Sequence, residues 1–530
     1  MRDEKTIVVT GTSAVVFPPS RFSRLSSLDR GISHLSSPCP NPVPPRCVPT
    51  QSRRIDFGVP VIILVADGAR PDSLAQAMDD GALPALARLR AEGAAHTVTS
   101  TFPSVTGPAY APFLLGRFPG PVGLPALRWF DRARTQAAFP HYTRSYVGHE
   151  MRHVDRDIAS DAPTLFELAP RALGSLSVIQ RGLAKTSRLG RGARFALRAA
   201  RTHFSGDASR WLDIDREMGH EVARRVREER PDFVFAALTG IDKASHAEGH
   251  DHGLVADAMR IVDDVAAELR DDAERAGRWE QTHLWVVSDH GHSPVTAHDD
   301  LAAELEAAGH RVVAHPCVYR AHPDVAVMVR GNAMAHLYLD IDAQRRPWWP
   351  ALGERWGAFA EMLLQRPSVD LALLPQSPTR CEVASATRGR AVVSLDQSSA
   401  GVVTYTYRTT TGDPLGIGRE LAAVSGDEAF EATIATDYPD SVVQVAHLAG
   451  ASRSGEIILS AAREWDFRAR YEPIPHRSSH GALHREHMLV PLIVNKPPAR
   501  EPRRTVDVMP SAVAALGIAA PPGLDGESFV

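Results

Sequence analysis

The stretch Pro60-Val-Ile-Ile-Leu-Val-Ala-Asp67-Gly68 is an unbroken apolar run that ends on a carboxylate. Such a run predicts a strand that is buried on both faces, as in a parallel sheet covered by helices. Proteins with such sheets bind their ligands at the carboxyl ends of the strands, and Asp67 lies at such an end. A carboxylate in this position is also a common turn former or helix cap, so Asp67 alone does not identify a functional site.

The same pattern occurs twice more along the chain. A second apolar run spans 232–238 and a third spans 283–288, and each is preceded by a stretch with the apolar spacing of a helix. This alternation of strands and helices predicts an α/β fold with a mostly parallel central sheet. The polar residues that follow the two runs are Asp242, His246, Asp289 and His290. Three strand ends therefore supply the candidate residues of one site.

The composition is that of an ordinary globular protein. The chain has 530 residues, of which 44% are hydrophobic and 23% charged, and this length allows about two or three domains. The formal net charge of −4 gives no general attraction to a nucleic acid duplex. The 4 cysteines are widely spaced and predict neither a disulfide framework nor a thiolate metal site. We find no candidate transmembrane segment and only a poor signal peptide, and so expect a cytoplasmic protein.

Changes in composition divide the chain into four segments. Residues 1–56 are rich in serine and proline without periodicity and are expected to be a disordered leader. We expect 57–309 to form the first part of the α/β core, 310–425 a smaller α+β insertion, and 426–530 the completion of the core.

Within the first part of the core, residues 171–211 are strongly basic and are expected to be a helical insertion. They carry nine Lys and Arg residues against the single acid Asp207, with apolar residues interleaved. Such a segment is either an amphipathic cap with a solvated basic face, or a lid that attracts an anionic substrate or a lipid surface.

The residue types at the strand ends indicate a metal site. Carboxylate and imidazole are ligands of zinc and related divalent ions, and crowded carboxylates are costly to bury without a cation. Asp242 and His246 are four residues apart and would share one face of a helix. His480, in a late histidine-rich loop, is a further candidate ligand. The plainer alternatives are a surface turn at Asp289-His290 and an exposed helical pair at Asp242 and His246.

A nucleophile is expected beside such a site, and the candidate is Thr101 in the loop Ser100-Thr-Phe-Pro-Ser104. A hydroxyl is a weak nucleophile at neutral pH, but coordination to a metal ion can ionise it. Ser104 and Thr106 are lesser candidates. The alternative for Thr101 is a threonine that ends an edge strand before a proline.

Taken together, five motifs resemble the alkaline phosphatase superfamily and, within it, the nucleotide pyrophosphatase/phosphodiesterase (type I phosphodiesterase) branch. The motifs are Asp67-Gly68, Thr101-Phe-Pro103, Asp242-x-x-x-His246, Ser288-Asp289-His290-Gly291 and Ser479-His480-Gly481. The resemblance covers about 58–305 and 440–530. It implies an alkaline-phosphatase-like three-layer α/β/α sandwich with a mostly parallel central sheet and a smaller α+β insertion.

The resemblance also implies two divalent metal ions, expected to be zinc. Asp67, Thr101, Asp289 and His290 would hold one ion, and Asp242, His246 and His480 the other. Thr101 would attack phosphorus, and water would then hydrolyse the phosphothreonine intermediate. The implied activity is that of a phosphodiesterase or nucleotide pyrophosphatase on a small phosphate ester or nucleotide. Phosphomonoesterase, phosphonate hydrolase and a non-catalytic relative that binds phosphorylated ligands remain open, as does the oligomeric state.

The sequence departs from the pattern of the family in two places. Family members often carry an Asn about twenty residues after the nucleophile that binds a phosphoryl oxygen, whereas this chain has Val122-Gly-Leu-Pro-Ala-Leu. A backbone N–H or Arg128 is expected to replace it. In the last histidine loop, His484 and His487 could support the ligands or substitute for them. A sulfatase is excluded because Cys47-Val-Pro-Thr-Gln lacks the Arg of the sulfatase motif and precedes the first strand.

Overall fold

The structure is a computed structural model that describes residues 60–132, 143–146, 148–315, 321–468, 472 and 474–530. All of these belong to one structural unit of the chain, 56–530. The leader predicted at 1–56 lies outside the described residues.

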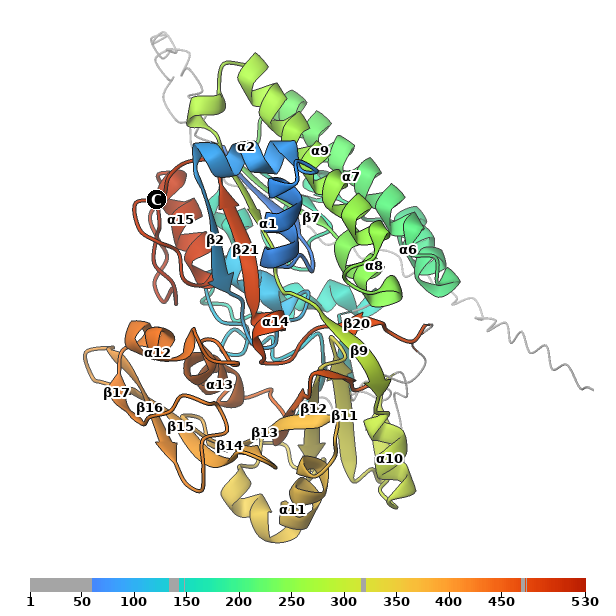
Figure 1. Ribbon diagram of the computed structural model, residues 1–530, viewed down its shortest axis with the longest axis vertical. Helices are drawn as coiled ribbons and strands as arrows, with labels where there is room; N and C mark the ends of the chain where they lie inside the picture. Colours follow the sequence, from blue (N-terminus) through green and yellow to red (C-terminus); the bar gives the residue numbers. More distant parts are fainter. Residues whose placement is uncertain (1–59, 133–142, 147, 316–320, 469–471, 473) are drawn as a thin grey trace, which may run out of the picture. The chain divides into compact units, whose positions relative to one another are not determined.

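A seven-stranded sheet forms the centre of the α/β core (Figure 1). In spatial order its strands are β2 (Ala94–Thr99), β21 (Leu489–Val494), β8 (His283–Val287), β1 (Val61–Ala66), β7 (Phe233–Leu238), β5 (Ala172–Ser175) and β6 (Arg188–Leu189). β1 pairs in parallel with β7 and β8, while β21 runs antiparallel to β8 and β2. The predicted mostly parallel sheet is confirmed, and the three predicted apolar runs are its adjacent central strands.

Helices cover both faces of this sheet because successive residues of β1 point to opposite sides. Ile62 and Leu64 pack against α1 (Pro71–Asp79), α2 (Pro84–Glu92), α7 (Ser209–Glu229) and α9 (Gly253–Arg275). Val61 and Ile63 belong to the core cluster on the other side, which includes α3 (Ala111–Leu115) and α15 (Val508–Ala515). The fold is therefore the predicted three-layer α/β/α sandwich.

Two separate helices, α1 and α2, connect β1 to β2. The chain leaves α1 through Gly81, whose φ of +74° is incompatible with a continuing helix, and α2 begins at Pro84. Proline is favoured in the first turn of a helix because it has no N–H to leave unpaired.

A second, nine-stranded sheet forms the smaller α+β unit. Its order is β10 (Val312–Ala314), β11 (Val325–Arg330), β12 (Met334–Leu339), β18 (Ile457–Ala461), β13 (Val369–Ser377), β14 (Arg380–Ser385), β15 (Gly389–Gln397), β16 (Val403–Thr409) and β17 (Leu421–Val424). Its helices are α10 (Leu301–Ala307), α11 (Trp349–Leu364), α12 (Gly426–Thr433) and α13 (Ser441–Ala449). This unit was expected to end at 425, but β18 pairs with both β12 and β13. An apolar strand sequence does not specify which sheet it will join, and here the unit continues to 461.

The basic segment 171–211 was expected to be a helical insertion, and this interpretation holds only for its last part. β5 and β6 extend the central sheet at one edge, and only α6 (Ala193–Ser205) is a surface helix, exposing Leu197 and Phe204. The short strands were missed because β6 consists of two residues only.

A small three-stranded sheet brings the late histidine loop to the core. It contains β19 (Glu464–Asp466), β9 (Ser293–His298) and β20 (Ser478–Ser479), in that order. β9 follows the Asp289-His290 turn, and β20 precedes His480 directly. Pairing of Ser479 with Ser293 therefore sets His480 beside that turn. The remaining elements include η1 (Pro108–Tyr110), β3 (Arg128–Phe130), β4 (Thr143–Ser145), α4 (Val154–Asp157), α5 (Leu165–Leu168), α8 (Gly240–Glu248) and α14 (Arg485–Met488).

No helix in the described part of the chain combines the length and the apolar character that crossing a membrane requires.

Candidate active site

The first group of predicted ligands meets at the ends of β1 and β8. Asp67 follows β1, and Asp289 and His290 follow the neighbouring strand β8, so their side chains converge in the buried interior. Nε2 of His290 lies 3.3 Å from Asp67 Oδ1 and 3.6 Å from Asp289 Oδ2. Asp289 Oδ2 accepts no hydrogen bond from any residue that the structure describes. We call Asp67, Asp289 and His290 the first cluster.

The second group forms around Asp242. α8 places Asp242 and His246 one turn apart, as their spacing predicted, and Nε2 of His246 lies 3.1 Å from Asp242 Oδ1. Nε2 of His480 lies 3.5 Å from the same oxygen. A residue that sequence reasoning missed completes the ring, because Nε2 of His292 also lies 3.1 Å from Asp242 Oδ1. We call Asp242, His246, His292 and His480 the second cluster.

The contacts of Nδ1 show which ring nitrogen of these histidines carries a proton. Nδ1 of His246 lies 2.9 Å from the carbonyl oxygen of Ser478, and Nδ1 of His480 lies 2.8 Å from that of Ser104. His290 makes the same kind of contact with the carbonyl of Gly291, at 3.2 Å. A carbonyl only accepts hydrogen bonds, so Nδ1 carries a proton in each ring, and in the neutral imidazole Nε2 presents a lone pair to the carboxylates.

Lone pairs that face carboxylate oxygens repel one another unless a cation lies between them. Burial and the neighbouring Asp67 carboxylate raise the pKa of Asp289 to about 8, and burial lowers the pKa of His292 to about 3. Both directions express the cost of burying a charged group. A bound dication would lower the pKa of Asp289 and keep His292 neutral, so that both groups could act as ligands. Two groups of buried donors have ligand atoms within 4.8 Å of one another, Asp242, His290, His292 and His480, and Asp67, Asp289 and His290. His246 is not in either group, although it contacts Asp242. These oxygen and nitrogen donors fit a divalent metal centre.

Lys243 balances part of the charge of the second cluster. Its Nζ donates a hydrogen bond to Asp242 Oδ2 at 2.6 Å, which leaves Oδ1 for the histidines. Burial opposes ionisation of Asp242, but Lys243 and His246 outweigh it and hold the pKa of this carboxyl well below its usual range.

The hydroxyl that the structure brings to the first cluster is that of Thr106, whereas sequence analysis had favoured Thr101. Thr106 Oγ1 lies 3.2 Å from Asp67 Oδ1 and 3.1 Å from His290 Nε2. Tyr110 donates a hydrogen bond to the other oxygen of Asp67, at 3.2 Å. Thr101 Oγ1 is buried and has no hydrogen-bond partner among the described residues. Of these two threonines, Thr106 makes the contacts with the first cluster that were expected of Thr101.

A signal for Thr106 was present in the sequence. The loop contains two Thr-x-Pro triplets, Thr101-Phe-Pro103 and Thr106-Gly-Pro108, and only the second leads directly into the helical turn η1. Proline in a first helical turn favours the second triplet as the loop-to-helix junction. His292 had a weaker signal, since it follows the Asp289-His290-Gly291 motif directly.

Asp215 positions the second cluster from outside and had no signal in the sequence. Its carboxylate accepts hydrogen bonds from the backbone N–H groups of Thr239, at 3.0 Å, and Gly240, at 2.5 Å, where α8 begins. Burial raises the pKa of Asp215 to about 7, although these two N–H groups oppose the shift. Asp215 therefore fixes the start of the helix that carries Asp242.

Three further residues that the sequence suggested as supporting or substitute groups make contacts outside the two clusters. His487 accepts a hydrogen bond from the N–H of Ala482 and contacts Ser293 Oγ at 2.8 Å, so both of its nitrogens hold the loop around His480. His484 contacts Glu486 at 2.8 Å. Arg128, a predicted replacement for the missing Asn, lies on β3, and its Nε donates a hydrogen bond to Ser145.

Comparison with known proteins agrees with this geometry. The profile of the family described as type I phosphodiesterase / nucleotide pyrophosphatase matches residues 61–346. No curated protein sequence matches the chain.

Two solved structures share the fold. One is phosphonoacetate hydrolase from Sinorhizobium meliloti 1021 in complex with phosphonoacetate, with 17% sequence identity, a TM-score of 0.51, and coverage of 87% of this chain and 96% of that one. The other is murine ectonucleotide pyrophosphatase / phosphodiesterase 5, inactive through one threonine-to-alanine change and in complex with AMP, with 14% identity, a TM-score of 0.51, and coverage of 88% and 97%.

The matched segment covers more than half of the chain and contains Asp67, Thr106, Asp242, His246, Asp289 and His290. Its central strands and buried Asp and His clusters agree with the motifs found in the sequence. The chain belongs to the type I phosphodiesterase / nucleotide pyrophosphatase family of the alkaline phosphatase superfamily, whose members are hydrolases that act on phosphate esters.

Proposed function

We propose that the protein is a phosphodiesterase or nucleotide pyrophosphatase with two divalent metal ions and with Thr106 as its nucleophile. One observation carries the proposal: Thr106 Oγ1 lies within hydrogen-bond distance of both Asp67 Oδ1 and His290 Nε2, and these two atoms lie 3.3 Å apart. Thr101 has no such surroundings, since its buried hydroxyl has no partner among the described residues.

The two clusters would hold the two ions. Asp67, Asp289, His290 and Thr106 would bind one, and Asp242, His246 and His480 the other. Zinc is the expected metal, because the donors are imidazole nitrogens and carboxylate oxygens without thiolates. When bound, the ions supply Lewis-acid stabilisation of the threonine alkoxide and of the leaving oxygen.

The reaction would take place in two displacement steps. Thr106 loses its proton and attacks phosphorus in line with the leaving group, so that one P–O bond forms as the other breaks. The product is a phosphothreonine, which water hydrolyses in a second displacement. The murine relative supports a threonine in this role, because one threonine-to-alanine change accompanies its inactivity.

The substrate is expected to be a small phosphate ester or a nucleotide. AMP is bound to the murine relative, and phosphonoacetate to the bacterial one. The bacterial relative favours a second candidate function, hydrolysis of phosphonates at the same metal centre. Phosphomonoester hydrolysis has the same requirements for ligands and nucleophile.

A substrate panel with metal control tests the proposal. The full-length protein is assayed with bis(p-nitrophenyl) phosphate, p-nitrophenyl phosphate, an aryl phosphonate ester, phosphonoacetate and nucleotides. We expect the diesters to be hydrolysed fastest, a chelator to abolish turnover and zinc to restore it. A zinc-loaded protein that binds nucleotides but hydrolyses none of these compounds would instead be a non-catalytic relative.

A further inference from the structure

Asp242 Oδ1 is surrounded by three imidazole nitrogens, although the motifs of the family account for only two of them. The distances to Nε2 are 3.1 Å for His246, 3.1 Å for His292 and 3.5 Å for His480. In a tetrahedral zinc site with bonds of about 2.0–2.1 Å, neighbouring donor atoms lie about 3.3 Å apart. The three distances lie on either side of this value.

The three rings are also spaced as the ligands of one ion. Ring centres lie 5.0 Å apart for His246 and His292, 5.1 Å for His246 and His480, and 5.1 Å for His292 and His480. Imidazoles bound to one tetrahedral zinc through Nε2 have ring centres about 5.2 Å apart, because each centre lies about 3.2 Å from the metal. His292 therefore has the same spacing as the two histidines that the motifs predict.

Hydrogen bonds also select the tautomer of His292 that can bind a metal. Ser478 Oγ donates its one proton to the carbonyl of Ser293, at 2.8 Å. The contact of 3.2 Å between His292 Nδ1 and Ser478 Oγ must then be donated by Nδ1–H, which leaves a lone pair on Nε2. Since the carbonyl of Ser478 also binds Nδ1 of His246, this one serine orients two rings of the second cluster.

Gly68 makes room for this imidazole. A Cβ atom at this position would lie 2.9 Å from Nε2 of His292 and 3.1 Å from the Cα of Asp242. The glycine after the first catalytic carboxylate therefore lets His292 reach the second cluster.

We propose that His292 is a fourth protein ligand of the ion held by Asp242, His246 and His480. The inference rests on the metal centre of the proposed function. It gives the second ion four protein ligands, three histidines and one aspartate. Catalytic zinc sites usually have three protein ligands and one open position. An ion with four protein ligands is retained more firmly, and a substrate oxygen can then reach it only as a fifth ligand or by displacing His292.

The competing role is structural: His292 could only hold Ser478, without binding metal. The two roles predict opposite results for two substitutions. In His292→Asn the amide replaces Nδ1 and can still donate to Ser478 Oγ, but no atom remains at the position of Nε2. In His292→Gln the amide oxygen can occupy the position of Nε2, but the donor to Ser478 is lost.

The experiment measures zinc bound per chain after dialysis against a competing chelator, and the visible spectrum of the cobalt-substituted protein, which reports coordination number. We expect the unmodified protein to bind two ions, His292→Asn to hold one of them at least about 10-fold more weakly, and His292→Gln to recover part of the affinity. The cobalt spectrum should change in His292→Asn. His220→Gln, on α7 with a side chain that is 72% exposed, is the control and should match the unmodified protein.

The outcomes separate this inference from the proposed function. Two tightly bound ions and an unchanged cobalt spectrum in His292→Asn would overturn the fourth ligand and leave the proposed function intact. An unmodified protein that binds no divalent ion would overturn the proposed metal centre itself. Circular dichroism confirms that each variant is folded before metal is measured.

Discussion

Thr106 Oγ1 lies 3.1 Å from Nε2 of His290, and Nδ1 of the same ring contacts a carbonyl oxygen, so the neutral imidazole has its lone pair on Nε2. The hydroxyl donates to Asp67 Oδ1 at 3.2 Å and so lies between two of the proposed ligands of the first ion. This arrangement suits a threonine that loses its proton, and it distinguishes Thr106 from the buried hydroxyl of Thr101.

Valine substitutions of the two threonines give a matched test, because valine keeps the shape of the side chain and removes only the hydroxyl. We expect Thr106→Val to lower kcat by about 10³-fold or more, since the nucleophile is lost. Thr101→Val should keep its activity and at least its stability, because it removes a polar group that has no partner among the described residues. Activity is measured with bis(p-nitrophenyl) phosphate, and acid-quenched protein is digested to locate the phosphopeptide. A phosphate found on Thr101, together with an active Thr106→Val variant, would show that Thr101 is the nucleophile, as the sequence predicted.

Removing the Asp215 carboxylate should weaken metal binding by the second cluster, although Asp215 is not a member of that cluster. Asp215→Ala leaves the N–H groups of Thr239 and Gly240 without this acceptor, at a cost of about 1–3 kcal/mol. Because α8 carries both Asp242 and His246, we also expect weaker zinc retention. Thermal unfolding and zinc content measure the two effects.

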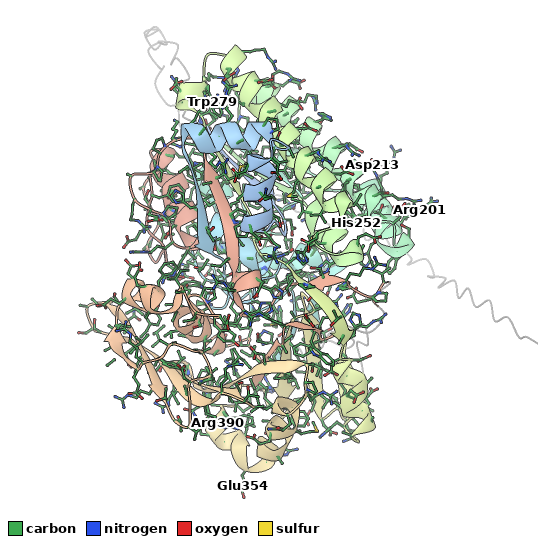
Figure 2. All side chains as sticks on the ribbon, in the orientation of Figure 1. Arg201, Asp213, His252, Trp279, Glu354 and Arg390 are labelled. Carbon is green, nitrogen blue, oxygen red and sulfur yellow. The ribbon has the colours of Figure 1, made fainter. Side chains whose placement is uncertain are left out.

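The control for Asp215 lies on the same helix. Asp213 has a side chain that is 63% exposed and pairs with Arg216, and Figure 2 shows it at the outer surface. Asp213→Ala should change neither stability nor zinc content measurably. Equal effects of the two substitutions would contradict an anchoring role for Asp215.

Alanine substitutions of two glycines with similar backbone conformations distinguish the effect of backbone strain from that of steric crowding. Gly68 and Gly81 have φ values of +82° and +74°, so alanine at either position costs about 1–2 kcal/mol in backbone strain. A Cβ at Gly68 would meet His292, whereas a Cβ at Gly81 has nothing within 4 Å. We expect Gly68→Ala to lose more stability than Gly81→Ala because of these close contacts, and only Gly68→Ala to lose zinc. Normal zinc content in Gly68→Ala would show that the cluster tolerates the added methyl group.

Stability should depend on pH through a histidine far from the metal centre. Burial lowers the pKa of His336 to about 3, although the carbonyl of Pro125, which accepts its Nε2–H, opposes this shift. Between this value and the ordinary pKa of about 6.5, the unfolded chain binds a proton on this imidazole and the folded chain does not. The free energy of unfolding therefore falls as the pH is lowered below about 6.5, with a slope of about 1.4 kcal/mol per pH unit from this group.

Urea unfolding between about pH 5 and 7.5 tests this sign by comparing the unmodified protein with His336→Gln. The difference in the free energy of unfolding between the two should shrink as the pH falls. His220→Gln is the control, because that side chain is 72% exposed. A difference that stays constant with pH for His336→Gln would contradict the linkage.

The sequence predicted best what local patterns determine. The apolar runs at β1, β7 and β8 identified the central strands, because strands buried on both faces need continuous apolar residues. Asp242 and His246 were found because their spacing is one helical turn. The wrong predictions involve long-range pairing. β18 joins the second sheet through neighbours about ninety to one hundred and twenty residues away in sequence, and no local pattern specifies such partners.

The candidate site was incomplete for the same reason. His292 and Asp215 look like any buried histidine or helical aspartate until Asp242 and α8 are placed beside them. Thr101 was predicted over Thr106 because Thr101-Phe-Pro103 resembles a motif of the family. Contact with Asp67 and His290, which only the fold reveals, favours Thr106 as the proposed nucleophile.

The position of β21 has a consequence for how the enzyme is made. β21 is the last strand of the chain, and it pairs with β8 on one side and with β2 on the other. Until residue 494 has left the ribosome, β2 cannot be joined to the sheet, and the second cluster lacks His480 until shortly before. The second cluster can therefore be completed only after residue 480 has been made, and its side chains then join segments that lie far apart in the sequence. A chain that ended before this residue would carry most of the family's motifs and still lack His480 in the second cluster.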